Sequence, residues 1–198
     1  MKKIILLIVV FVAACFLAYK LLSDKPVHVE APKDQALRIS KNSPAFNNAF
    51  DSLLAQYFGV RDALVDADTL KADQAAYNLG AKADSLPIRL LKGDSGIILT
   101  AKSVAAAVSG DAKGFSSEGG LEGRRKSLNV LTDDMYNLIR AIHYDEAKIY
   151  QISCPMAFKD STAGTWLSQS TQIVNPYLGR KDASMLVCGQ VIDSFPGK

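Results

Sequence analysis

The chain has 198 residues, 48% of them hydrophobic and 22% charged, with 23 Lys and Arg against 20 Asp and Glu. Three of the bases and none of the acids lie within the first 22 residues, so the rest carries 20 of each and is formally neutral. This balance argues against nucleic acid as a partner, because such binding needs a basic surface.

Residues 1–22 predict an N-terminal membrane anchor or signal segment. Two early lysines precede an apolar run over residues 4–22 that only Lys20 interrupts, and about 20 such residues span a bilayer. The early charges predict an inner-membrane anchor with the following chain in the periplasm. Cys15 follows Val-Ala-Ala, as in a bacterial lipoprotein cleavage box, so lipidation at Cys15 is one alternative and plain secretion is another. The anchor, the lipidation and the secretion interpretations all place the rest of the chain in the bacterial cell envelope.

Residues 23–43 are polar, contain two prolines and show no sustained periodicity, so they predict a spacer. Residues 44–198 are long enough for a single exported helical domain with its own core. Apolar residues at steps of three and four predict four amphipathic helices, with Ser43 as the cap of the first. The helices are expected at about residues 44–66, 69–86, 95–108 and 121–142. Short connections between them predict an antiparallel four-helix bundle.

The pattern changes in the C-terminal subregion, residues 147–192. Residues 147–153 and 185–192 are rich in β-branched and apolar side chains and predict two strands. The fold class is therefore mainly α, with a small two-stranded antiparallel β element and a loop at the C-terminus. If the strands pair, the end of the first lies beside the start of the second.

Two Cys/Met pairs lie at those strand ends: Cys154 with Met156, and Met185 with Cys188. Thiolate and thioether groups are the ligands that Cu(I) prefers, so the four side chains predict a soft-metal site. A second interpretation is that Cys154 and Cys188 form a disulfide, because the periplasm is oxidising. That interpretation needs no cofactor, and the residues alone leave both open.

Four short motifs together resemble a bacterial family known as domain of unknown function 3347. In chain order they are Cys154–Phe158, Trp166–Ser168, Asn175–Gly179 and Met185–Gly189. The resemblance covers about residues 45–191. Members of that family often occur as free exported proteins or fused to periplasmic adaptor subunits of copper and other heavy-metal efflux pumps. The resemblance therefore implies metal handling, with such an adaptor or another efflux component as partner.

Related heavy-metal modules continue with His-Pro where this chain has Ala157-Phe158, and family members often have a His where Ser153 stands. The missing histidines favour Cu(I) over Zn(II). His143 follows the fourth predicted helix and has either a structural role at the helix end or, as the minor alternative, a role in metal binding. The remaining motif residues predict a supporting loop made by Trp166, Asn175, Pro176, Tyr177, Gly179 and Gly189.

No catalytic signature surrounds either cysteine, and Cys-X-X-Cys and glycine-rich phosphate loops are absent, so we expect no enzyme. The predicted function is a membrane-anchored, periplasm-facing accessory domain that binds or hands over Cu(I) in heavy-metal efflux or homeostasis. The alternative is a disulfide-stabilised structural or protein-interaction module of the cell envelope without metal.

Overall fold

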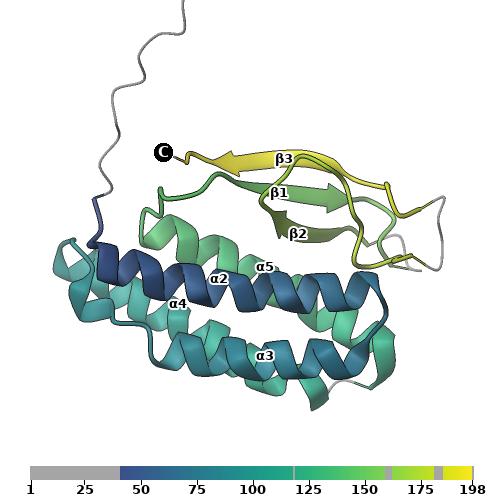
Figure 1. Ribbon diagram of the computed structural model, residues 1–198, viewed down its shortest axis with the longest axis horizontal. Coiled ribbons are helices and arrows are strands. Elements are labelled where there is room, and N and C mark those ends of the chain that lie inside the picture. Colours follow the sequence, from purple (N-terminus) through teal and green to yellow (C-terminus); the bar gives the residue numbers. More distant parts are fainter. Residues whose placement is uncertain (1–40, 118, 159–161, 181–184, 198) are drawn as a thin grey trace, which may run out of the picture. The chain divides into compact units, whose positions relative to one another are not determined.

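In the part of the chain that the structure describes, four helices come first and a small sheet follows them (Figure 1). The computed structural model describes residues 41–117, 119–158, 162–180 and 185–197. The predicted anchor, Cys15 and nearly all of the predicted spacer lie outside these described residues. Within them, no helix is both long and apolar enough to cross a bilayer.

The helices are α2 (Pro44–Val65), α3 (Thr69–Asp84), α4 (Ser95–Gly114) and α5 (Gly120–Ala141), with short 3-10 turns at Ile88–Leu90 and Phe115–Ser117. The side chains of Ser43, Asp68 and Asp94 cap three of them by accepting a backbone N–H bond. The prediction of a mainly helical chain with four helices is confirmed. The third helix runs six residues beyond its predicted end, because the buried Ala112 continues its inward face.

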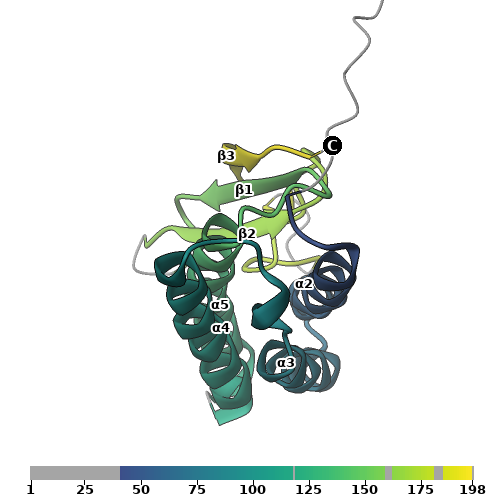
Figure 2. The same cartoon turned by 90° about the vertical axis from the view of Figure 1, so that its left-hand side faces the viewer.

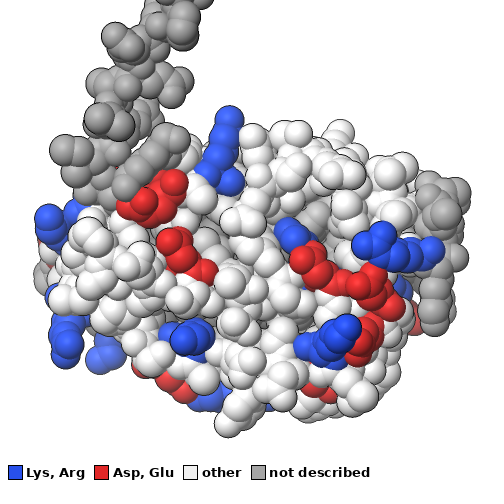
Figure 3. All heavy atoms as spheres, viewed as in Figure 1, with Lys and Arg blue, Asp and Glu red and all other residues white. Residues whose placement is uncertain are grey.

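Each helix packs against the next one in the chain, and α2 also contacts α5. The core between them is apolar and aromatic, and Met135 is fully buried within it. Met135 is therefore a packing residue. Charged side chains lie outside this core, and Figure 3 shows acidic and basic groups interspersed on the face seen there.

The sheet has three antiparallel strands in the order β2-β1-β3. They are β1 (Ile149–Cys154), β2 (Gly164–Ser168) and β3 (Gln190–Phe195). The predicted count of two strands was therefore too low, since β2 was not predicted. The last strand also begins later than residue 185, because Met185 and Cys188 form a turn in which the Cys188 N–H donates to the Met185 carbonyl at 2.9 Å.

The sheet lies against α2 and α5 (Figures 1 and 2). A buried hydroxyl pair joins the layers: Tyr57 Oη on α2 is 2.7 Å from Thr132 Oγ1 on α5. Tyr57 Oη also accepts the Leu167 N–H of β2 at 3.0 Å. Burial raises the pKa of Tyr57 to about 12, so its hydroxyl stays protonated at neutral pH. One tyrosine therefore fixes β2 to both helices.

Two acids form a hydrogen-bonded pair between α4 and α5. Burial, followed by the hydrogen bond and charge of Asp111, raises the pKa of Asp134 from 3.8 to about 7. A carboxyl group with a higher pKa in the folded chain destabilises the fold as pH rises. The cost begins near pH 4, where the unfolded chain ionises, and is complete above about pH 7.

Asp134→Asn is expected to raise the free energy of unfolding by about 1 kcal/mol at pH 8 and to change it little at pH 4. The amide keeps a donor for Asp111 and removes the charge, and partial solvent exposure keeps the gain below the full pKa shift. Urea denaturation of the full-length chain between pH 4 and 8 measures this difference. Asp111→Asn should act in the same direction, and a gain of equal size at both pH values would contradict the prediction.

Candidate functional site

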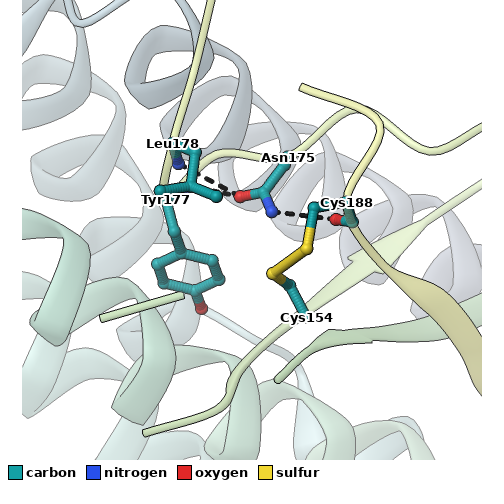
Figure 4. Close-up of a disulfide and its surroundings, with 5 residues drawn as sticks. All are labelled: Cys154, Asn175, Tyr177, Leu178 and Cys188. Carbon is teal, nitrogen blue, oxygen red and sulfur yellow. Dashed lines mark hydrogen bonds between the residues drawn. A yellow bond between two sulfur atoms is a disulfide. The ribbon is translucent and has the colours of Figure 1, made fainter. Parts of the chain in front are cut away.

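The C-terminal motifs meet at a disulfide between Cys154 and Cys188 (Figure 4). Cys154 is the last residue of β1 and is fully buried, whereas Cys188 lies just before β3 and is half-buried. Their Cα atoms are 5.7 Å apart, and 34 positions separate them in the sequence. The bond therefore ties the end of the β2–β3 connection, residues 169–189, to the central strand.

The buried side chain of Asn175 also stabilises the β2–β3 connection. It is fully buried, and its Oδ1 accepts the N–H groups of Tyr177 at 2.8 Å and Leu178 at 3.2 Å. Its Nδ2 donates to the Cys188 carbonyl at 2.9 Å (Figure 4). The backbone N–H of Asn175 donates to the Leu186 carbonyl at 2.8 Å. One side-chain amide thus shapes the turn after Asn175 and positions the residue that carries the second sulfur.

Tyr177 anchors this turn to the core. Its ring is buried and lies edge-on to Trp166, with 6.1 Å between ring centroids. The Tyr177 hydroxyl donates to the Thr165 carbonyl and lies 3.2 Å from Oδ1 of Asn129 on α5. Burial raises the pKa of Tyr177 well above its usual value, so the group is a neutral hydrogen-bonding anchor.

Two glycines permit close backbone approaches at this site. Gly179 has φ +68°, and a Cβ there would lie 2.8 Å from the Val65 carbonyl oxygen at the end of α2. Gly189 has φ +150°, and a Cβ there would lie 2.7 Å from the Trp166 ring. Side chains larger than glycine are disfavoured at both positions by conformation and by space. A hydrogen bond also joins the β2–β3 connection to α5, because the Pro176 carbonyl accepts from Arg125 Nε at 3.0 Å.

The methionines differ from the cysteines in their placement. Met156 is 56% exposed and borders a pocket of about 260 Å³ with Phe158, Leu178 and Arg125 among its lining residues. Met185 is half-buried in the turn that precedes Cys188. Among the residues that the structure describes, no group of three or more His, Cys, Asp or Glu side chains is placed to hold a metal ion.

The chemistry of the site depends on the oxidation state of its sulfurs. In the disulfide, neither sulfur is a thiolate, so the cysteines do not supply the soft anionic ligands that would hold a metal ion here. On reduction, two thiols would lie on backbone positions whose Cα atoms are 5.7 Å apart. His143 lies elsewhere: it follows the end of α5, has φ +51° and lines a different pocket.

Residues on the helices support the site and were not predicted to do so. Asn129 accepts the Thr165 N–H at 2.8 Å, and Arg61 Nη1 donates to the Leu167 carbonyl at 2.9 Å. Thr132 is fully buried and bonded to Tyr57. One local signal in the sequence could have indicated such a supporting residue. Thr132 is polar but lies on the inward, apolar face of the fourth predicted helix.

The fold and the site define a class: a four-helix domain with a C-terminal antiparallel sheet, in which a disulfide secures the β2–β3 connection. Residues 53–147 match the family described as Protein of unknown function (DUF3347), so this part of the chain is similar to that family. The match runs from α2 to just before β1, so it ends before both site cysteines and is shorter than the predicted 45–191. No curated protein and no solved structure matches the chain.

Proposed function

We propose that the chain is an accessory protein of the bacterial cell envelope whose C-terminal subregion is a disulfide-stabilised protein-interaction module. Residues 4–22 hold it at the inner membrane, or lipidation at Cys15 does, and the domain lies in the periplasm. The four helices, arranged as an antiparallel bundle, form the support. The partner is a periplasmic adaptor or another component of a heavy-metal efflux system.

The observation that carries this proposal is the disulfide together with the side-chain amide of Asn175. Both hold the backbone of the β2–β3 connection, and the polar atoms of Asn175 and Tyr177 are used in bonds within the protein. Such a site is suited to presenting a fixed surface and supplies no free nucleophile or base for catalysis. Met156 and Val187 lie close in sequence to the two cysteines and are 56% and 66% exposed, so they are the residues offered to a partner.

Photo-crosslinking in cells tests the interaction. A photoreactive residue at position 156 or 187 of the full-length chain is expected to form an adduct with an efflux adaptor subunit. The same residue at position 99 is the matched control, because Leu99 is equally exposed at 69% but lies on α4. Cys188→Ser should abolish the adducts at 156 and 187. Equal adducts at all three positions, or adducts unaffected by Cys188→Ser, would contradict the proposal.

A second candidate function is Cu(I) binding by the reduced protein. The short Cα separation of Cys154 and Cys188 favours it, because two thiolates there lie within reach of one ion. Met156 and Met185 supply thioethers, and the exposure of Met156 leaves its sulfur open to exchange with a partner.

The reduced full-length chain is then expected to bind about one Cu(I) per molecule. Met156→Leu combined with Met185→Leu should weaken binding by roughly tenfold, since each thioether ligand is lost without loss of volume. Competition with a Cu(I) chelator measures the affinity. Met135→Leu is the matched control, because Met135 is buried among the helices. If the double variant holds copper as well as the control, the methionines are not ligands.

A further inference from the structure

A pocket of about 640 Å³ lies beside the α3–α4 connection, residues 85–94. Its walls come from the last two residues of α3, from the first half of the connection and from one face of α4. The volume is within the range of pockets that hold small organic groups. Nothing in the proposed function uses this pocket.

The apolar part of the pocket wall is accessible. Ile88 of the connection and Ile98 of α4 both line the pocket and are half-buried, so each leaves part of its side chain open. Leu90, two positions after Ile88, is 36% exposed. These side chains therefore offer apolar surface that a bound group can remove from water.

The charges at the pocket are basic in balance. Arg89 and Lys102 line it and are exposed, and among the described residues neither side chain pairs with an acid. Asp84 is the one acid in the wall, and its carboxylate is already occupied. It accepts from Lys113 Nζ and from Ser109 Oγ, each at 2.6 Å. The two basic side chains are thus free to bind an anion.

The rest of the connection adds to this positive charge. Lys92 is a third exposed base. Asp94 is the other acid between residues 84 and 102, and it caps α4, because its Oδ1 accepts the Ile97 N–H at 2.9 Å. An exposed segment that combines three bases with apolar side chains has the character of a surface that binds anionic lipid.

The connection lies at the end of the helices where α2 begins. Its 3-10 turn contacts α2, and Figure 2 looks onto this end, with the connection beside the start of α2. β1 runs toward the opposite end, so Cys154, its last residue, lies far from the connection (Figure 1). Residues 23–43 join the proposed anchor to α2 and reach at most about 70 Å when fully extended. The end that carries the connection is therefore the one attached to the anchor.

We propose that the α3–α4 connection docks on the anionic periplasmic surface of the inner membrane, with a phospholipid phosphate between Arg89 and Lys102. The glycerol and upper acyl chain lie against Ile88 and Ile98, and Leu90 enters the headgroup region. The bases select the phosphate, and the apolar contacts add binding energy that a free phosphate ion cannot supply. This inference rests on the proposed membrane attachment and is independent of the disulfide and of any metal.

Attachment makes a weak lipid site effective, because the short link to the anchor keeps the local concentration of lipid surface high. Docking also orients the domain. With the start of α2 at the membrane, Met156 and Val187 lie toward the opposite end and face a partner in the periplasm.

Quenching of tryptophan by brominated lipid tests the docking. The full-length Leu90→Trp variant is reconstituted in nanodiscs of phosphatidylglycerol with bromine on the upper acyl chain. Emission from the added indole is expected to fall relative to nanodiscs without bromine, because docking brings position 90 to the headgroup boundary. Leu70→Trp is the matched control and should keep its emission, since Leu70 is 81% exposed at the other end of α3. The unsubstituted chain gives the contribution of the buried Trp166.

The charge of the lipid is tested in the Leu90→Trp background. Brominated phosphatidylcholine, which has no net charge, should quench at least about fivefold less. Arg89→Gln combined with Lys102→Gln should lower the ratio of docked to undocked domain roughly 25-fold in phosphatidylglycerol, at about fivefold for each base. Lys71→Gln combined with Lys126→Gln is the matched control, because both bases are exposed and neither lines the pocket.

Copurification of the chain with the nanodiscs separates this inference from the proposed attachment. A chain that copurifies but is quenched equally at positions 90 and 70 overturns the docking and leaves the attachment standing. Equal quenching by the two lipids, or by the two double variants, overturns it as well, since the bases then do not select the phosphate. A chain absent from the nanodiscs contradicts both. Lys92→Trp gives a second probe at an exposed position of the connection and should report the same docking if Leu90→Trp folds poorly.

Discussion

Reduction of the disulfide between Cys154 and Cys188 is expected to lower the free energy of unfolding by about 3 to 4 kcal/mol. The bond closes a loop between residues 34 positions apart, and opening it restores conformational freedom to the unfolded chain. For a domain of this size, the melting temperature should fall by about 10 °C.

Thermal and urea denaturation of the full-length chain with and without dithiothreitol measure this loss. Cys188→Ser should reproduce the loss without a reductant, because it leaves Cys154 without a disulfide partner. Cys15→Ser is the matched control and should still respond to dithiothreitol as the wild type does. If reduction shifts the wild-type melting temperature by less than about 2 °C, the bond does not hold the fold.

Asn175→Ala is expected to cost about 2 to 4 kcal/mol. The substitution removes the acceptor of two N–H groups, those of Tyr177 and Leu178, and the donor to the Cys188 carbonyl. These groups lie in a buried turn, where each lost bond leaves a polar atom unsatisfied. The disulfide should also become easier to reduce, because Cys188 loses the hydrogen bond from Asn175 that positions it.

Urea denaturation gives the free energy, and thiol titration at increasing dithiothreitol concentration gives the ease of reduction. Asn137→Ala, at an exposed position of α5, should change the free energy of unfolding by less than about 0.5 kcal/mol. A cost below about 1 kcal/mol for Asn175→Ala, together with unchanged reduction, would show that the amide does not shape this turn.

The helices could be predicted from the sequence because their signals are local. Apolar steps of three and four and the capping residues Ser43 and Asp68 lie within the segments that they define. β2 gave no comparable signal. Trp166 and Leu167 are consecutive and both buried, so this short strand is covered on both faces and shows no alternation of apolar and polar residues.

The candidate site could be predicted only in outline. The sequence brings Cys154 and Cys188 to neighbouring strand ends but leaves their chemistry open, and the structure joins them in a disulfide. The start of the last strand was misplaced because the turn before Cys188 is fixed partly by Asn175, which donates to Leu186 from eleven positions away. The hydrogen bond between Tyr57 and Leu167 also spans 110 positions of the sequence. Contacts between residues so far apart produce no periodic pattern in the sequence.

The position of Trp166 has a practical consequence, because the chain contains no other tryptophan. Its ring is 1% exposed and lies between Tyr177 and Gly189, at the junction of the sheet with its closing segment. Indole fluorescence of this protein is therefore a local optical probe. It reports the opening of that junction and is insensitive to loosening confined to α3 and α4.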